Sequence, residues 1–342
     1  MDWSALSDQV LAGVPATPAD AMAILDSGDD TLLPLLQAAF QIRSHYWGRG
    51  VRIHVLRNAK SGICAENCSF CSQASSAYSG IDHYKMQSVE ELIEGARAAH
   101  AQNAVKYCIV TATRGPSSAQ LDTICDAVRR IKSELPIKIC TSLGLLAEGQ
   151  AEQLAAAGVD RFNHNLETSE DYYPKVCQTH TYQDRMQTLQ RVKDAGMETC
   201  CGGIMGMGET KTDRIQLAFS LAELGTESVP VNFLDPRPGT PLEKVKRLSP
   251  NDALRCLAMF RFVNPSAEIR VAGGREVVLR DMQALALYPA NSLFSEGYLT
   301  TGGQGHSQDE KLILDAGFFV ESIENDTPDL APTSSCCTEE PA

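Results

Sequence analysis

The sequence lacks several features that would place it in common protein classes. It contains no run of about 18 apolar residues, so we expect no transmembrane helix. Basic residues are in the minority, with 30 Lys and Arg against 43 Asp and Glu, which gives a formal net charge of −13. This balance argues against nucleic acid as a partner, because a broad nucleic-acid surface needs clustered Lys and Arg. Charged residues make up 21% and hydrophobic residues 43%, which excludes a mostly disordered chain.

The N-terminal segment MDWSALSDQV also lacks the features of a targeting sequence. It has no basic region followed by an apolar stretch, and it is not Arg-rich. We therefore expect a cytoplasmic protein whose thiols stay reduced. Twelve cysteines in 342 residues are too sparse for a disulfide scaffold. They are expected to be buried fillers, catalytic thiols or metal ligands, and their spacing decides between these roles.

Short apolar segments alternate with longer amphipathic ones from about residue 51 onward. Strands are predicted at 51–57, 105–111, 137–143, 161–167, 197–204, 228–234, 268–274 and 291–296. Helices are predicted between them at 88–102, 118–135, 148–158, 182–196 and 212–225. This alternation favours an α/β fold of the (β/α)8 TIM-barrel type, with a doubly wound open sheet as the alternative. Mid-strand Cys, Asn, His and Arg support the barrel, because an ordinary parallel core would carry Val, Ile and Leu.

The two ends of the chain differ in character from this alternating region. A helical pattern over 29–48 predicts an N-terminal helical extension, assigned to residues 1–49, and the barrel is assigned to residues 50–322. The tail, residues 323–342, is rich in Pro, Ser, Thr and acidic residues and has no periodicity. It is predicted to be disordered, and its adjacent cysteines, Cys336 and Cys337, are given no role.

Three cysteines form a tight C-x3-C-x2-C cluster in the loop after the first predicted strand: Cys64, Cys68 and Cys71. Barrel active sites lie at this end of the strands, and three thiolates on one loop can converge on a polynuclear metal centre. In a cubane iron–sulfur cluster, three ligands would leave one iron open. A zinc site would want a fourth ligand, for which His83 is the nearest candidate at an unattractive distance. Packing cysteines would not cluster at this spacing.

With Phe70 directly before its last cysteine, this array resembles that of the radical S-adenosylmethionine enzymes. The resemblance implies a [4Fe-4S] cluster on Cys64, Cys68 and Cys71, whose open iron binds the amino and carboxylate groups of S-adenosylmethionine. It also implies cleavage of that sulfonium to a 5′-deoxyadenosyl radical. The fold that it implies, a full or partial (β/α) barrel, agrees with the alternation of elements.

A second constellation lies in the predicted strands. Cys108, Cys140 and Cys200 each occupy the middle of a different strand, and Arg270 does the same in the seventh. Inward-facing residues of barrel strands meet across the interior, so these four side chains can converge. Taken singly, a cysteine is more often a small buried filler. That filler interpretation is given to Cys125, Cys177 and Cys256.

Several segments, taken together and in order, resemble the biotin synthase family: NAKSGICAENCSFCSQ, YCIVTATRGP, KICTSLGLL, RFNHNLETS, THTYQDR, GGIMGMGET, SVPVNFLDPRPGTPLE and RVAGGRE. The likeness implies that a [2Fe-2S] cluster is held by Cys108, Cys140, Cys200 and Arg270. The implied reaction is the radical conversion of dethiobiotin to biotin, the last step of biotin biosynthesis, with this auxiliary cluster as the sulfur donor. A homodimer and an electron donor such as a flavodoxin or ferredoxin are also implied.

By the same resemblance, five residues would contact S-adenosylmethionine or the substrate: Phe70, Asn165, Glu167, Arg185 and Asn232. The two asparagines suit a ureido ring or a ribose, because a buried amide offers both a donor and an acceptor. Arg185 matches the position that pairs with the S-adenosylmethionine carboxylate. Glu167 departs from the Asp or Asn usual in the family near the ribose hydroxyls. The glycines of segment 202–209 are expected to let the backbone approach a cofactor.

No side chain is assigned a catalytic role, since the cofactors carry the chemistry. Two alternatives remain open. One is a related radical barrel enzyme with a different substrate, which would lack the full Cys/Cys/Cys/Arg set. The other is a non-enzymatic iron–sulfur or zinc protein, which would form no 5′-deoxyadenosine.

Overall fold

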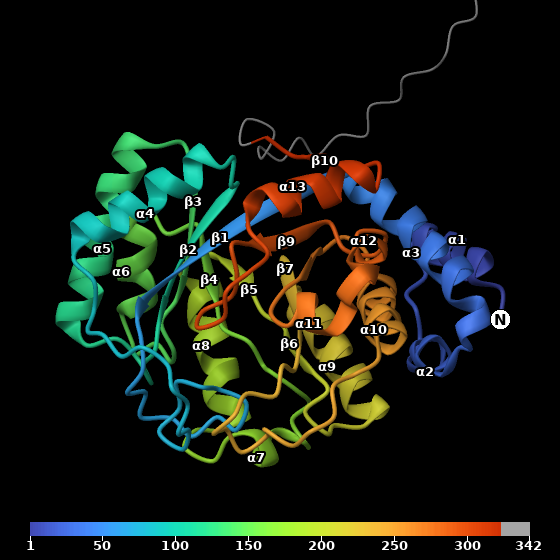
Figure 1. The fold of residues 1–342 in the computed structure, drawn as a ribbon, viewed down its shortest axis with the longest axis horizontal. Coiled ribbons are helices and arrows are strands. Elements are labelled where there is room, and N and C mark those ends of the chain that lie inside the picture. The colour runs from blue at the N-terminus through green and yellow to red at the C-terminus, as the bar shows by residue number, and fades with distance from the viewer. Residues whose placement is uncertain (323–342) are drawn as a thin grey trace, which may run out of the picture.

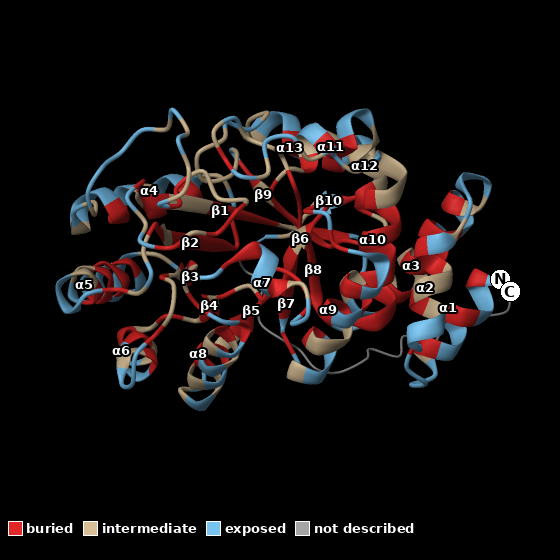
Figure 2. Cartoon of the chain, turned by 90° about the horizontal axis from the view of Figure 1, so that it is seen from below, coloured by how far each residue is buried: buried red, intermediate tan, exposed pale blue. Residues whose placement is uncertain are grey.

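The computed structural model describes residues 1–322, and the tail with Cys336 and Cys337 lies outside these described residues. At its centre is a ring of parallel strands surrounded by helices (Figures 1 and 2). In order around the ring these are β1 (Gly50–Lys60), β2 (Lys106–Thr111), β3 (Lys138–Ser142), β4 (Arg161–Asn163), β5 (Glu198–Cys200), β7 (Ser228–Phe233), β8 (Glu268–Val271) and β9 (Ser292–Ser295). Strand β9 pairs with β1 and closes the ring. The (β/α)8 barrel is therefore confirmed, and the open sheet is wrong.

Two short strands lie beside this ring. Strand β6 (Gly203–Met205) pairs with β7, and β10 (Phe319–Val320) pairs with the start of β1. The prediction of one strand over 197–204 is wrong, because the chain breaks between β5 and β6. A Cβ atom at Gly202 would lie 1.9 Å from the carbonyl oxygen of Pro230, so only glycine allows this approach to β7.

The predicted helices between the strands are present with closely similar bounds. They are α4 (Val89–Ala101), α5 (Ser118–Glu134), α6 (Gln150–Ala157), α8 (Tyr182–Asp194) and α9 (Lys211–Leu224). All but α6 begin with a capping box, in which an N-cap Ser or Thr and the residue three positions on exchange hydrogen bonds. This local chemistry explains why these helices could be predicted from sequence.

Helices also pack on one side of the barrel, outside the ring. The first three, α1 (Trp3–Leu11), α2 (Pro18–Asp26) and α3 (Leu32–Trp47), precede β1, and α2 and α3 pack on α10 (Pro250–Val263) (Figure 2). Only α3 was predicted. In addition, the structure contains the short helices α7 (Tyr173–Val176), α11 (Arg275–Leu279), α12 (Gln283–Ala286) and α13 (His306–Asp315). No helix within residues 1–322 is long and apolar enough to cross a membrane.

Candidate functional site

One cavity, with a volume of about 460 Å³, collects the residues that were singled out in the sequence. Its walls come from the interior of the barrel and from the segments that follow the strands. All of the predicted site residues line it: Cys64, Cys68, Phe70, Cys71, Cys108, Cys140, Asn165, Glu167, Arg185, Cys200, Asn232 and Arg270. The barrel thus brings together side chains from across about 200 residues of sequence, at the end where barrel active sites lie.

The loop after β1 carries the cluster of three cysteines, and Gln73 closes it. The carbonyl of Gln73 accepts a hydrogen bond from the backbone N–H of Cys64 at 3.2 Å, and its Oε1 accepts one from Gly62 at 3.1 Å. The N–H of Cys71 donates to the carbonyl of Cys68 at 3.0 Å, which places these two residues in one tight turn. The loop therefore presents three thiols to the cavity from a hydrogen-bonded frame.

The electrostatics of this loop fit a metal centre. Burial, with a smaller contribution from the nearby Cys64, raises the pKa of Cys71 to about 11. Burial likewise raises the pKa of Cys64. Thiolates this close repel one another unless a cation lies between them, so the donor set fits a polynuclear iron centre with one open position. Metal binding here must release the thiol protons.

A second set of thiols converges deeper in the barrel. Cys108 and Cys140 are paired in register across β2 and β3. A hydrogen bond with Cys108 raises the pKa of Cys140 well above its usual value, although contact with Cys200 acts in the opposite direction. Arg270 Nη1 donates to the Sγ of Cys200 at 3.5 Å, and all four side chains are buried. Three converging thiols beside a guanidinium, away from water, fit a compact iron–sulfur cluster.

A buried charge network lies on the far side of these thiols and, apart from Arg270, outside the lining of the cavity. Its centre is Glu268, at the start of β8, and sequence analysis missed it. The side chains around its carboxylate are Arg52, His54, Lys106, Arg161, Ser228, Arg270 and Ser292. His54 Nε2 lies 3.0 Å from Oε1 of Glu268, and Arg161 Nη1 lies 3.1 Å from Oε2. We call this set the barrel floor.

The barrel floor gathers several cations around one carboxylate. Burial alone would raise the pKa of Glu268, but Arg161, His54 and Arg270 hold it well below its usual value. Burial and the Arg270 charge lower the pKa of His54, so this imidazole is neutral and donates from Nε2 to Glu268. Arg52 and Arg161 also pair with Glu321 and Glu198. The charges of Arg270 and Arg161 act against burial to lower the pKa of Cys200, so they favour an anionic group among the interior thiols.

The Arg185 guanidinium is fixed on the other side of the cavity. Its Nε donates to the hydroxyl of Tyr173 at 2.5 Å and to His180 Nε2 at 3.1 Å, while its Nη1 donates to the carbonyl of Asn165 at 2.7 Å. Nη1 also lies 3.7 Å from the carboxylate of Glu167. This is a buried, preorganised cation of the kind that binds a carboxylate.

Glu167 has an unusual backbone for a glutamate, with φ at 70°. Its N–H donates to the carbonyl of Gly202 at 3.0 Å, and its carbonyl accepts from Ile204 at 2.9 Å. A Cβ atom at Gly203 would lie 2.4 Å from that carbonyl oxygen. The glycines at 202 and 203 thus allow two protein segments to approach closely. Burial raises the pKa of the Glu167 carboxyl.

The remaining predicted contacts, Asn232 and Phe70, are also held in place. Asn232 Nδ2 donates to the carbonyl of Gly203 at 3.2 Å, and its Oδ1 accepts from the N–H of Gly273 at 2.9 Å. This amide therefore joins β6 to the segment after β8 and keeps one oxygen lone pair for a ligand. Phe70 is partly buried and packs against the apolar cluster that includes Val176.

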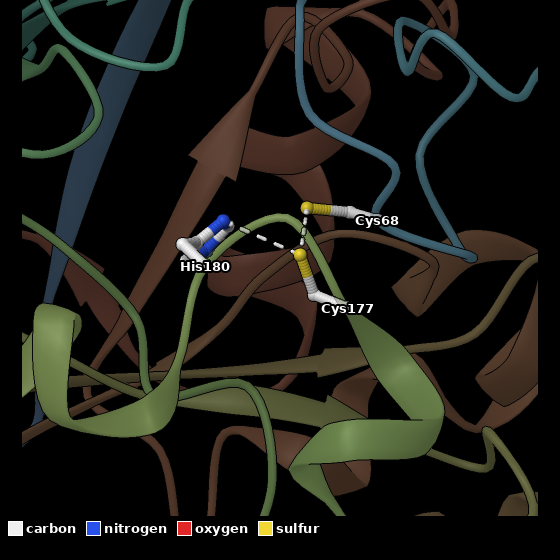
Figure 3. Close-up of side chains that lie close together, drawn as sticks. All are labelled: Cys68, Cys177 and His180. Carbon is white, nitrogen blue, oxygen red and sulfur yellow. Dashed lines mark hydrogen bonds between the residues drawn. The ribbon is translucent and has the colours of Figure 1, made fainter.

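Sequence analysis missed two groups of residues at the site. Asn163, on β4, donates from Nδ2 to the Sγ of Cys200 at 3.3 Å. Cys177 is buried in the core, as the filler interpretation expects, and its Sγ also lies 3.8 Å from that of Cys68 and 3.3 Å from His180 Nδ1 (Figure 3). The hydrogen bond from Cys68 lowers the pKa of Cys177 and raises that of Cys68. His83, the histidine considered from sequence, is exposed.

Comparisons with known proteins agree with this arrangement. Residues 59–221 match the family model of the radical SAM superfamily, and residues 230–319 match that of the Biotin and Thiamin Synthesis associated domain. The chain is 55% identical over 323 residues to a biotin synthase of Salinibacter ruber, which covers 94% of this chain and 90% of the relative. It is 49% identical over 322 residues to a biotin synthase of Bacillus subtilis, covering 94% and 96% respectively.

Solved structures with little sequence identity share the fold. A methylornithine synthase superposes with a TM-score of 0.83 at 20% identity, covering 93% of this chain and 98% of its own. The FeFe-hydrogenase maturase HydG from Carboxydothermus hydrogenoformans gives a TM-score of 0.76 at 17% identity, covering 92% and 78%. At these identities the likeness concerns the barrel alone.

Proposed function

Because the chain belongs to the biotin synthase family of radical S-adenosylmethionine enzymes, we propose that the cavity described above holds two iron–sulfur clusters with the reactants between them. The protein is a sulfur-inserting enzyme of biotin synthesis, and it converts dethiobiotin to biotin. Its family uses a [4Fe-4S] cluster, an auxiliary [2Fe-2S] cluster and S-adenosylmethionine. When bound, these groups supply the electron, the 5′-deoxyadenosyl radical and the sulfur.

Each of the two sets of thiols is assigned to one of the two clusters. In this proposal Cys64, Cys68 and Cys71 hold the [4Fe-4S] cluster near the cavity mouth. The interior set, Cys108, Cys140, Cys200 and Arg270, holds the [2Fe-2S] cluster. Arg270 lies within 3.5 Å of Cys200, and the cationic barrel floor beneath it supports an anionic cluster at this depth.

The polar side chains between these sets position the reactants. Arg185 pairs with the S-adenosylmethionine carboxylate. At the ribose, Glu167 accepts hydrogen bonds and Asn165 donates them. Asn232 offers its remaining lone pair to the ureido ring of dethiobiotin. Phe70 and the other apolar walls exclude water from the radical. Each of these side chains is held by contacts within the protein, so little ordering remains to be done on binding.

The partners and the location of the enzyme follow from the same proposal. The reaction needs an electron donor of low potential, such as a flavodoxin or ferredoxin. We expect a homodimer in the cytoplasm, where thiols stay reduced. The alternative of a non-enzymatic iron–sulfur or zinc protein is set aside, because the relatives with half of their residues identical are enzymes.

The observation that carries this proposal is the convergence of two thiol triads on one cavity. Its test is anaerobic reconstitution with iron and sulfide, followed by reaction with S-adenosylmethionine, a reductant and dethiobiotin. We expect two clusters by Mössbauer spectroscopy, together with 5′-deoxyadenosine and biotin as products. Formation of 5′-deoxyadenosine without biotin would point to a different substrate. A chain that binds one cluster only would contradict the division of ligands.

A further inference from the structure

A fourth thiol stands beside the three-cysteine loop, on a segment far away in sequence. Cys177 and His180 belong to the segment between α7 and α8, and Cys68 belongs to the loop after β1. One ligand atom from each of these three residues lies within 4.8 Å of the others, and all three side chains are buried (Figure 3). The proposed reaction uses neither Cys177 nor His180.

The distances within this trio match a tetrahedral metal. A Zn²⁺ ion with Zn–S bonds of about 2.3 Å holds two sulfur ligands about 3.8 Å apart, and a sulfur and a nitrogen ligand about 3.6 Å apart. The Sγ atoms of Cys68 and Cys177 are 3.8 Å apart, and Cys177 Sγ lies 3.3 Å from His180 Nδ1. Two thiolates and an imidazole are also the ligands that Zn²⁺ prefers.

Hydrogen bonds between the loop after β1 and the segment between α7 and α8 hold these two segments together without a metal. Asn67 Oδ1 accepts hydrogen bonds from the backbone N–H groups of Gln178 at 3.0 Å and Thr179 at 3.3 Å. Its own N–H donates to the hydroxyl of Thr179 at 3.2 Å. Cys68 and His180 line the cavity, which gives an ion a path to the site. The trio is therefore preorganised and accessible.

We propose that the cluster-free chain binds one divalent soft metal ion, such as Zn²⁺, through Cys68, Cys177 and His180. Glu66 Oε2 lies 2.6 Å from His180 Nδ1, so the ion displaces the ring proton shared with this carboxylate. The proton then resides on Nε2, and Arg185 must turn away from the ring. Cys68 is also a proposed ligand of the [4Fe-4S] cluster, so the metal-bound and cluster-bound states exclude each other.

The bound ion would join the cluster loop to the segment before α8. This crosslink would keep the loop folded until iron and sulfide arrive, and it would compete with cluster assembly. The inference goes beyond the proposed reaction and requires neither S-adenosylmethionine nor dethiobiotin. Its failure is therefore distinguishable from a failure of the enzyme assignment.

The test is a Zn²⁺ titration of full-length, cluster-free chain against a chromophoric chelator under anaerobic reducing conditions. A Cys140→Ser background leaves the interior thiol set incomplete. We expect one equivalent of Zn²⁺ to bind to the parent chain, and we expect Cys177→Ser and His180→Asn each to lower the affinity for that equivalent at least tenfold. Cys71→Ser and Cys125→Ser, the latter a matched buried cysteine on α5, should leave that equivalent unchanged. Loss of binding in Cys71→Ser but not in Cys177→Ser would assign the ion to the cluster loop alone and overturn the proposal.

Two further measurements need no substitution of Cys68, Cys177 or His180. X-ray absorption of Zn²⁺ in the Cys140→Ser chain should show two sulfur ligands with nitrogen or oxygen completing the shell, and a three-sulfur shell would overturn the proposal. Reconstitution of the [4Fe-4S] cluster should remove the same equivalent of Zn²⁺. If the cluster-loaded chain kept that equivalent, Cys68 would not be shared between the two states, and the inference would fail.

Discussion

Glu268 and Arg270 stand two positions apart on β8 and form an ion pair that is buried beneath the interior thiols. The same carboxylate also pairs with Arg161 and accepts a hydrogen bond from the neutral His54, so it contacts two buried guanidinium groups. Arg270, which is proposed to hold the interior cluster, thus depends on the Glu268 carboxylate, which contacts no thiol in the cavity wall. The first prediction concerns this dependence.

Replacing Glu268 by Gln should destabilise the chain strongly, because Arg270 would be left buried without its carboxylate partner and Arg161 would keep only the partly exposed Glu198. Breaking a buried ion pair from one side costs about 3–5 kcal/mol. The free energy of unfolding of the cluster-free chain, measured with urea, should fall by this amount. Glu198→Gln is the matched control: Glu198 also pairs with Arg161, but its side chain is 41% exposed, so the loss should stay below about 1 kcal/mol. Equal losses in both variants would contradict a special role for the floor.

Cys140→Ala should abolish the [2Fe-2S] spectrum and biotin formation, because the central thiol of the interior set is lost. The [4Fe-4S] cluster should remain, and with it the formation of 5′-deoxyadenosine. Iron and sulfide counting with Mössbauer spectroscopy measures both clusters. Cys201→Ala serves as the control, since Cys201 packs in the apolar core. Loss of both clusters in Cys140→Ala would argue against two independent sites.

Arg185→Lys should raise the KM for S-adenosylmethionine by about tenfold or more, since an ammonium cannot reproduce the planar fork of a guanidinium. The rate of 5′-deoxyadenosine formation at increasing S-adenosylmethionine concentration gives this constant. Arg191→Lys, on the same helix and bonded only to the carbonyl of Leu146, should leave it nearly unchanged. An unaltered KM in Arg185→Lys would remove the proposed carboxylate contact.

The affinity for S-adenosylmethionine should depend on the ionisation of Glu167. Burial raises the pKa of this carboxyl above its usual value of 4.5, and only the ionised form can accept hydrogen bonds from both ribose hydroxyls. Affinity should therefore rise as the pH increases through the raised pKa and then level off. Binding titrations at a series of pH values should show this step in the wild type and lack it in Glu167→Gln. A pH profile identical in both chains would exclude the carboxylate from ribose binding.

The elements with local signals could be predicted from the sequence, and those shaped by tertiary packing could not. Capping boxes and terminal glycines mark the helices around the barrel, and β-branched or cysteine-bearing segments mark its strands. Helix α10 was missed because its residues from Ala253 to Val263 are all buried, so no polar face gives it a helical period. Packing of α2 and α3 on its outer face is the cause.

The site residues divide in the same way. Those close together in the sequence could be predicted, and those brought together by tertiary packing could not. Spacing predicts the loop of Cys64, Cys68 and Cys71, since its members are close in sequence. The contact between Cys68 and Cys177 spans 109 residues and arises only where two loops meet. Glu268 was missed because a charged residue at the start of a strand is typical of an exposed position. Only the closed barrel makes that position the centre of the interior.

The buried charges of the barrel floor close the barrel beneath the interior thiols, and in the proposed arrangement this fixes an order of events. Whatever occupies the deepest position must be installed before anything above it, so the interior cluster precedes S-adenosylmethionine and dethiobiotin. The same order applies in reverse once the sulfur of the interior cluster has been inserted into the substrate. In that arrangement the interior cluster could be restored only after product and spent cofactor had left, so turnover and repair would alternate in each chain.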